Sequence, residues 1–483
     1  MSTDLQQIKQ KSIKSVIFLS ARNFSIQAIS SIGFFILTIL LGTADVGLFG
    51  IVAETVAILG YFSDLGFVSA LIQQKKEVTK KQLQTAFTTQ QLLVILSILL
   101  VALTYPKIKI ARNYGPKETW ILISLVFSFF TASLKTIPSV LLERKLEFKK
   151  ISSVDIVENI FFYFLAVLLA SMGFGAYSYA YAIFAKSIVG LILIYKISPW
   201  PIGISFNWES AKKLFKFGIP YQINSLIAVA KDRLSNLLVA GIIGRNNFAF
   251  LTWGQKAPRV SLSIMDAVTR ISFPAFSRLQ KDKESLKKIL QKSTYFIALV
   301  AFPMLVGTAL IAKNIMFIVP KYTKWLPALV PLYVFCFNFA IAAITTPLTN
   351  AFNAVGKITV TTRLMIMWTV LTWIFYPILS LKFGLYGTLL ASIIVNLSSF
   401  YVWHLIKKHF SANIFTAILH PLLASLIMLS ALLLISQLPI SHFSQLISKI
   451  LIGTLIYVGY HLIFSKQQLL WFFHQLKSIK KTN

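Results

Sequence analysis

The chain has 483 residues, of which 56% are hydrophobic and only 13% are charged, a balance far outside the range of soluble domains. A net charge of +32 would indicate nucleic-acid binding in a soluble protein, but here the charges lie in short loops between apolar stretches and inside those stretches. The composition therefore predicts a membrane protein without a nucleic-acid partner. The one cysteine, Cys336, excludes a disulfide framework and a cysteine metal site, and no metal is expected.

Apolar stretches that are long enough to cross a bilayer, about 20 residues each, recur fourteen times. Their predicted limits are 14–41, 45–72, 83–105, 117–141, 152–171, 174–195, 216–243, 247–273, 290–312, 325–350, 360–380, 384–406, 415–435 and 446–464. The first stretch is too long for a cleaved signal peptide, so we expect it to be retained. The pattern predicts an all-α, polytopic membrane protein with about 14 transmembrane helices.

The loop charges predict the orientation of these helices. If both termini are cytoplasmic, the inner loops and tails hold most of the 47 lysines and arginines, and the outer loops, to which we assign Lys449, hold few. Positively charged loops are translocated poorly, so this asymmetry favours cytoplasmic termini in a bacterial inner (plasma) membrane.

The two halves of the chain resemble each other. Leu41–Asp45 aligns with Ile243–Asn247, and the same offset places Asp64 on Asp266. Six helices per half give both copies one orientation, and a binding site is expected in the cleft between two such bundles. The predicted parts are a six-helix bundle (1–196), an amphipathic cytoplasmic linker (197–215), a second six-helix bundle (216–407) and two additional helices with a basic tail (408–483). The linker is expected to lie flat on the inner surface; an ordinary connecting segment is the alternative.

Charged residues inside the predicted helices are the main functional signal. The basic ones are Arg22, Lys135, Lys186, Lys231, Arg233, Lys256, Arg259 and Arg270. The acidic ones at similar depths are Glu54, Asp64, Asp155, Glu158, Asp232 and Asp266. Each charge in the middle of a helix costs roughly 2.5 to 3.5 kcal/mol on the insertion scale, so these groups must face one another or water.

The eighth predicted helix places Lys256, Arg259, Asp266 and Arg270 on one stripe, at spacings of three, seven and four residues. An anion-binding face is one interpretation, and a packing face neutralised by Asp266 is the other. The seventh helix carries Lys231-Asp232-Arg233 at its centre, where the side chains reach the surface least easily. Adjacent residues point in different directions, so a partner for Asp232 on a neighbouring helix is an open alternative.

Other charged residues have simpler explanations. Snorkelling accounts for Lys135, Arg270, Asp155 and Glu158 near the inner surface. The equivalent pair Asp64 and Asp266 is expected to anchor structure, whereas Arg22 and Lys186 lie deeper in the membrane. An excess of cations in a wet cleft attracts an anion, and arginine suits phosphate because its planar fork donates paired hydrogen bonds.

Three stretches resemble a known family. They are LGTADVGLF (41–49), FSDLGFVSALIQ (62–73) and LLERKLEFK (141–149). The sequence is similar to the Wzx-type polysaccharide (O-antigen) flippases of the MOP superfamily, which also includes the MATE multidrug exporters and the lipid II flippase. The helix count extends this likeness along the whole chain, least distinctively over the last two helices.

The resemblance implies two six-helix bundles that alternate between inward-open and outward-open states and carry an undecaprenyl-diphosphate-linked oligosaccharide. Basic cavity residues meet the diphosphate in such proteins, which by position implicates Arg22, Lys231, Arg233, Lys256 and Arg259. Lys186, which also lies deep in the membrane, is a further candidate for binding the diphosphate. Glu54, Asp64, Asp232 and Asp266 are candidates for coupling or structural roles, and coupling to H+ or Na+ is left open. No other cofactor is expected. The expected partners are membrane lipids and the polymerase and chain-length or export machinery, around a monomeric flippase.

Two other functions fit parts of the pattern. A MATE-like exporter of small molecules shares the fold, but a cavity for organic cations is expected to be acidic. A membrane glycan ligase or polymerase tends to need a large outer loop with paired carboxylates or histidines, which the sequence does not offer. We therefore expect a transporter and not an enzyme.

Overall fold

The computed structural model describes residues 22–64, 71–72, 77–111, 113–209, 211–212, 229–280 and 282–466. These residues form helices, turns and loops and contain no strand. Eleven helices among them are long and apolar enough to cross a membrane. The chain is therefore a multi-pass, all-α membrane protein, as predicted. It divides into two compact units, Met1–Ala249 and Phe250–Asn483.

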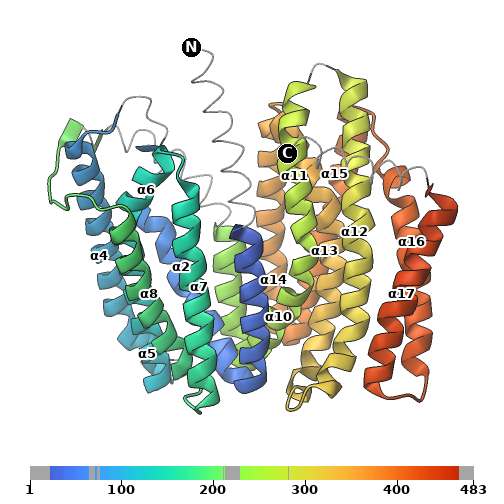
Figure 1. The fold of residues 1–483 in the computed structure, drawn as a ribbon, viewed down its shortest axis with the longest axis horizontal. Coiled ribbons are helices and arrows are strands. Elements are labelled where there is room, and N and C mark those ends of the chain that lie inside the picture. The colour runs from blue at the N-terminus through green and yellow to red at the C-terminus, as the bar shows by residue number, and fades with distance from the viewer. Residues whose placement is uncertain are drawn as a thin grey trace. The chain divides into compact units, whose positions relative to one another are not determined.

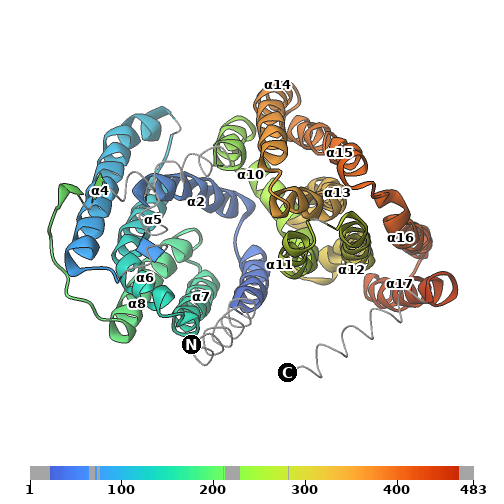
Figure 2. The same ribbon diagram turned by 90° about the horizontal axis from the view of Figure 1, so that it is seen from above.

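The long helices of the first unit run side by side (Figures 1 and 2). The described helices of this unit are Arg22–Leu40, α2 (Thr43–Asp64), α4 (Lys80–Ala111), α5 (Pro116–Leu134), the short α6 (Thr136–Arg144), α7 (Phe148–Ser171), α8 (Tyr177–Ile197), the π-helix η1 (Ala230–Leu234) and the start of α10 (Ser235–Arg259). Helix α5 packs against α2 and α8, and α7 packs against α8. Buried aliphatic and aromatic side chains of α2, α4, α5 and α8 form one core of this unit.

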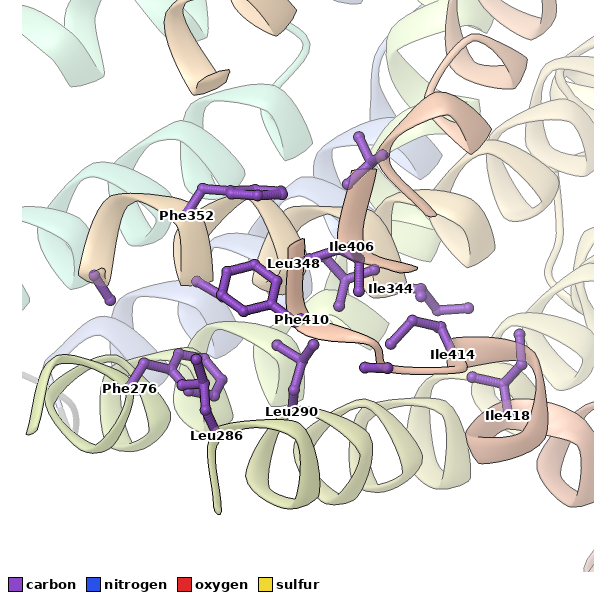
Figure 3. Close-up of a cluster of buried hydrophobic side chains, with 14 of the residues drawn as sticks. Phe276, Leu286, Leu290, Ile344, Leu348, Phe352, Ile406, Phe410, Ile414 and Ile418 are labelled. Carbon is purple, nitrogen blue, oxygen red and sulfur yellow. The ribbon is translucent and has the colours of Figure 1, made fainter. Parts of the chain in front are cut away.

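The second unit continues from α10. Its helices are η2 (Val260–Leu262), α11 (Ser263–Arg278), α12 (Lys283–Ile318), η3 (Thr323–Ala328), α13 (Leu329–Ala354), α14 (Ile358–Leu397), α15 (Phe400–Phe410), α16 (Ile414–Gln437) and α17 (His442–Phe464). Figure 3 shows its largest described core, in which Phe276, Leu290, Phe352, Phe410 and Ile418 come from five different helices. The last two helices pack against α12.

Each of the fourteen predicted spans overlaps helix within the described residues, so the predicted number of helices is confirmed. The predicted break between the seventh and eighth spans contains Gly244 (φ 79°) of α10, and the break between the eleventh and twelfth spans is followed by Gly384 (φ 56°) of α14. Both residues adopt the left-handed conformation that glycine accepts without strain, which lets the chain reverse there. The fourth predicted span is instead divided at Lys135, between α5 and α6.

The described part of the predicted linker has little regular structure. The backbone amides of Ser205 and Asn207 donate to the hydroxyls of Thr88 and Thr85 on α4. Outside the described residues lie 210 and 213–215 of the linker and 216–228 of the seventh predicted span. The division between Ala249 and Phe250 places the described part of the seventh span with the first unit, and the predicted four-part division stays a prediction.

A close approach of two helices in the first unit requires a glycine at position 47. A Cβ atom added to Gly47 would lie 2.0 Å from the backbone carbonyl oxygen of Arg245, which cannot swing aside as a flexible side chain can. Gly47→Ala is therefore expected to lower the free energy of unfolding by about 1 to 3 kcal/mol, as overpacking generally does. Thermal unfolding of the purified protein in detergent measures this change.

Gly60→Ala is the matched control, because Gly60 lies in the same helix and a Cβ there meets no atom within 4 Å. Alanine stabilises a helix interior relative to glycine by up to about 1 kcal/mol, so this variant should unfold at the same temperature or higher. Equal losses in the two variants would show that the contact with Arg245 is not tight.

Candidate functional site

Two ion pairs lie close together in the first unit. Arg22 Nη2 is 2.7 Å from Asp155 Oδ2, and Lys135 Nζ is 2.5 Å from Glu158 Oε1. Asp155 and Glu158 are three residues apart in α7 and therefore lie on one face of the helix. Snorkelling was expected for Lys135, Asp155 and Glu158, but these side chains form ion pairs within the protein.

A cavity of about 260 Å³ lies beside these pairs, lined in part by Lys135, Thr136, Ser139, Glu143 and Asp155. Burial raises the pKa of the Glu143 carboxyl; nearby Arg22 opposes this shift and Asp155 adds to it. A water molecule occupies about 30 Å³ in the liquid, so a cavity of this size that is lined in part by charged and hydroxyl groups has room for several. The cavity can thus hydrate the charged groups next to the Arg22–Asp155 pair.

Lys186 belongs to the same cluster. Its Nζ lies 5.1 Å from the centroid of the Phe162 ring, and it interacts electrostatically with Glu158, Lys135 and Asp155. One turn further along α8, Gly190 leaves room for the Glu158 carboxylate, which an added Cβ would overlap at 1.5 Å. The fold thus brings Lys186 near Arg22, both predicted site residues, in a charged cluster that also contains acids.

A second charged group in the first unit joins η1 to α2. Arg233 Nη1 lies 2.8 Å from Glu54 Oε2, and Lys231 Nζ lies 3.2 Å from Asp232 Oδ1. The residues of η1 form a π-helical turn, a rare conformation that is frequent at functional sites. Asp232 pairs with its neighbour in the sequence, Lys231, and forms no ion pair with a neighbouring helix among the described residues. The structure therefore brings the predicted residues Glu54, Lys231, Asp232 and Arg233 into ion pairs within one unit.

The polar stripe predicted for the eighth helix runs along the end of α10 and the start of α11. Lys256, Arg259 and Asp266 are all exposed, whereas Pro258 and Met265 on the opposite side are buried. The short helix η2 interrupts the stripe without removing it. Arg259 and Asp266 take part in none of the ion pairs formed among the described side chains. The side chains of Asp64 and Arg270 lie outside those described.

Sequence reasoning missed one further ion pair of the first unit. Glu118 in α5 has a side chain that is 8% exposed and accepts from Arg245 Nη1 at 2.5 Å. The guanidinium of Arg245 also covers the ring of Tyr114, 5.1 Å from its centroid. Glu118 accepts a further hydrogen bond from the backbone amide of Gly115 at 2.8 Å. Arg245 lies in the aligned turn Ile243–Asn247, between two predicted spans, and that alignment is the one sequence signal that could have pointed to it.

Lys449 lies near the start of the predicted span 446–464, and its assignment to an outer loop was wrong. It lies in α17 and is 3% exposed. Its Nζ donates to the carbonyl oxygen of Leu310 at 2.9 Å and to Asn314 Oδ1 at 2.6 Å. The helix begins seven residues before Lys449, at His442, and the acceptors that satisfy the buried amine come from α12.

Comparison with known proteins gives the family. The family described as "Polysaccharide biosynthesis protein" matches residues 36–330, more than half of the chain. The teichuronic acid biosynthesis protein TuaB of Bacillus subtilis is 24% identical over 55% of this chain and 55% of its own, so the match spans about half of that relative. The lipopolysaccharide biosynthesis protein WzxC of Escherichia coli is 22% identical over 71% of this chain and 70% of its own.

Among solved structures, the lipid II flippase MurJ in an inward closed conformation matches with a TM-score of 0.77. The match covers 94% of this chain and 100% of that chain at 17% identity, so it shows a shared fold. The resemblance to Wzx-type flippases that the three sequence stretches indicated is confirmed by the family match, which includes all three of them. The chain belongs to the family of polysaccharide biosynthesis proteins.

Proposed function

We propose that this protein is a flippase that moves an undecaprenyl-diphosphate-linked oligosaccharide from the inner to the outer leaflet of the plasma membrane. The observation that carries the proposal is the set of cationic side chains within the helices: Arg22, Lys186, Lys231, Arg233, Lys256 and Arg259. Membership of the polysaccharide biosynthesis family and the likeness to MurJ support a lipid-linked glycan as cargo.

A diphosphate accounts for the retention of these cations. Exposure to hydrocarbon would cost roughly 2.5 to 3.5 kcal/mol per charge, whereas a wet cavity shared with an anionic head group removes much of that cost. The guanidinium groups of Arg22, Arg233 and Arg259 can donate paired hydrogen bonds to phosphate oxygens, and the lysines add compact positive charges. We place the diphosphate among these residues and the lipid chain in the bilayer.

In this proposal the cationic cavity lies between the two bundles and opens alternately to each side of the membrane. Both termini are cytoplasmic and each chain acts as a monomer, because one chain contains both halves of the cleft. Glu54, Asp64, Asp232 and Asp266 have coupling or structural roles. The product passes to polymerase and export machinery in the outer leaflet.

Deletion of the gene tests the proposal and identifies the cargo. We expect a lipid-linked oligosaccharide to accumulate in the inner leaflet, where a membrane-impermeant glycan-modifying reagent added to intact cells does not reach it. A plasmid copy of the gene should restore its access to the reagent. Unchanged glycan export and no accumulated intermediate in the deletion strain would contradict the assigned function.

A further inference from the structure

Two arginines that we assign to the diphosphate site already hold a carboxylate. Arg22 pairs with Asp155 at 2.7 Å, and Arg233 pairs with Glu54 at 2.8 Å. The two pairs use different helices, since Asp155 lies in α7 and Glu54 in α2. The same arrangement is therefore built twice in the first unit, from unrelated positions in the sequence.

Both pairs are only partly buried. The side chains of Arg22 and Asp155 are 30% and 28% exposed, and those of Arg233 and Glu54 are 42% and 18% exposed, although Arg22 Nε and Asp155 Oδ2 are themselves buried. The Arg22–Asp155 pair also adjoins the cavity of about 260 Å³ that Asp155 lines. Glu118, by contrast, is 8% exposed in its pair with Arg245 and is also held by the Gly115 amide. Glu118 is therefore the most buried of the three acids and has a second donor, and these are the features of a structural bond.

Carboxylate and phosphate bind arginine through the same N–H donors. An anion that reaches Arg22 or Arg233 must therefore displace the carboxylate or share the guanidinium with it. A diphosphate carries more charge and more acceptor oxygens than one carboxylate, which favours the exchange. When the cargo is absent, the carboxylate keeps the arginine paired and lowers the cost of holding it within the membrane.

We propose that Asp155 and Glu54 occupy Arg22 and Arg233 in the empty flippase, give way to the diphosphate when cargo binds, and take the arginines back as cargo leaves. The proposal rests on the proposed function. It assigns the two acids as affinity-setting residues that do not themselves bind the cargo. A carrier that held its cargo with unopposed arginines would release it slowly, because affinity differences within one site lie mostly in the dissociation rate.

Binding of undecaprenyl diphosphate to the purified full-length protein in nanodiscs tests this role. Asp155→Asn and Glu54→Gln keep the shape of the side chain and remove the charge, and each should bind the lipid about tenfold more tightly than the wild type. Initial rates of glycan export in cells should fall in both variants, because release is slower. Glu118→Gln is the matched control, and its affinity should stay within twofold of the wild type.

A double-mutant cycle separates competition from a general structural effect. The increase in affinity caused by Asp155→Asn should disappear when Arg22 is replaced by alanine, because the guanidinium that Asp155 holds is then missing. Glu54→Gln should still tighten binding in the Arg22→Ala background, because Glu54 pairs with a different arginine. Unchanged or weaker binding in the variants that fold would overturn the proposal. The two pairs are independent, so if one variant does not fold, the other decides the question.

The outcomes also distinguish this inference from the proposed function. If the wild type does not bind undecaprenyl diphosphate and Arg22→Ala changes nothing, the assigned cargo is wrong and the role of the two acids falls with it. If the wild type binds the lipid and Arg22→Ala weakens binding, the cargo stands. In that case, an unaltered affinity in Asp155→Asn and Glu54→Gln would show that the acids do not compete with the diphosphate for the arginines, and the assigned cargo would still hold.

Discussion

Replacement of both Lys231 and Arg233 by alanine is expected to abolish glycan export while the protein stays in the membrane. The two residues lie in η1, and the change removes two positive charges that we assign to the diphosphate. A hydrogen bond to a charged group contributes about 1.5 to 3 kcal/mol, so the loss of two corresponds to a reduction in affinity of about 10² to 10⁴-fold. Surface glycan is measured together with the amount of inserted protein.

The control variant also removes two positive charges, from a part of the chain outside the proposed site. Lys283 and Lys288 lie on the exposed start of α12, outside the proposed cavity, and their double replacement by alanine should leave export unchanged. Arg233→Lys retains the charge but loses the planar fork, so it should export at an intermediate rate. Normal surface glycan from a well-inserted Lys231→Ala, Arg233→Ala protein would show that these cations do not hold the cargo.

The largest expected loss of stability comes from Arg245→Ala. The substitution leaves the Glu118 carboxylate, which is 8% exposed, without its cation. Removal of one member of a buried ion pair costs about 3 to 5 kcal/mol, and we expect the lower end because Arg245 is 33% exposed and Gly115 still donates to Glu118. Thermal unfolding in detergent should show a large downward shift in the midpoint.

A second substitution should restore most of this loss. Glu118→Gln in the Arg245→Ala background removes the unpaired charge, and a neutral amide is less costly to bury than a carboxylate. Arg363→Ala removes an exposed arginine of α14 and should change the free energy of unfolding by less than about 0.5 kcal/mol. If Arg245→Ala changed the free energy of unfolding as little as Arg363→Ala does, the Arg245–Glu118 pair would not contribute to stability.

The apolar pattern predicted the helices well because a membrane span needs a fixed length of apolar chain. The turns at Gly244 and Gly384 were also visible, since glycine marks a reversal of the chain between two apolar stretches. The break at Lys135 was missed because the apolar segment continues across it from α5 to α6. A proline does mark it: Pro138 has no backbone N–H to donate to the carbonyl oxygen of Leu134, the last residue of α5.

The sequence by itself determined that this is a multi-pass membrane protein, which family it resembles, and that charged residues such as Arg22, Lys186 and Arg233 lie within its helices. Only the tertiary structure decided the partners of those charges: Asp155 for Arg22, Glu54 for Arg233, Glu118 for Arg245, and neutral acceptors for Lys449. Apolar length and periodicity are local properties of a chain, whereas a contact between two charges depends on how helices distant in the sequence pack together.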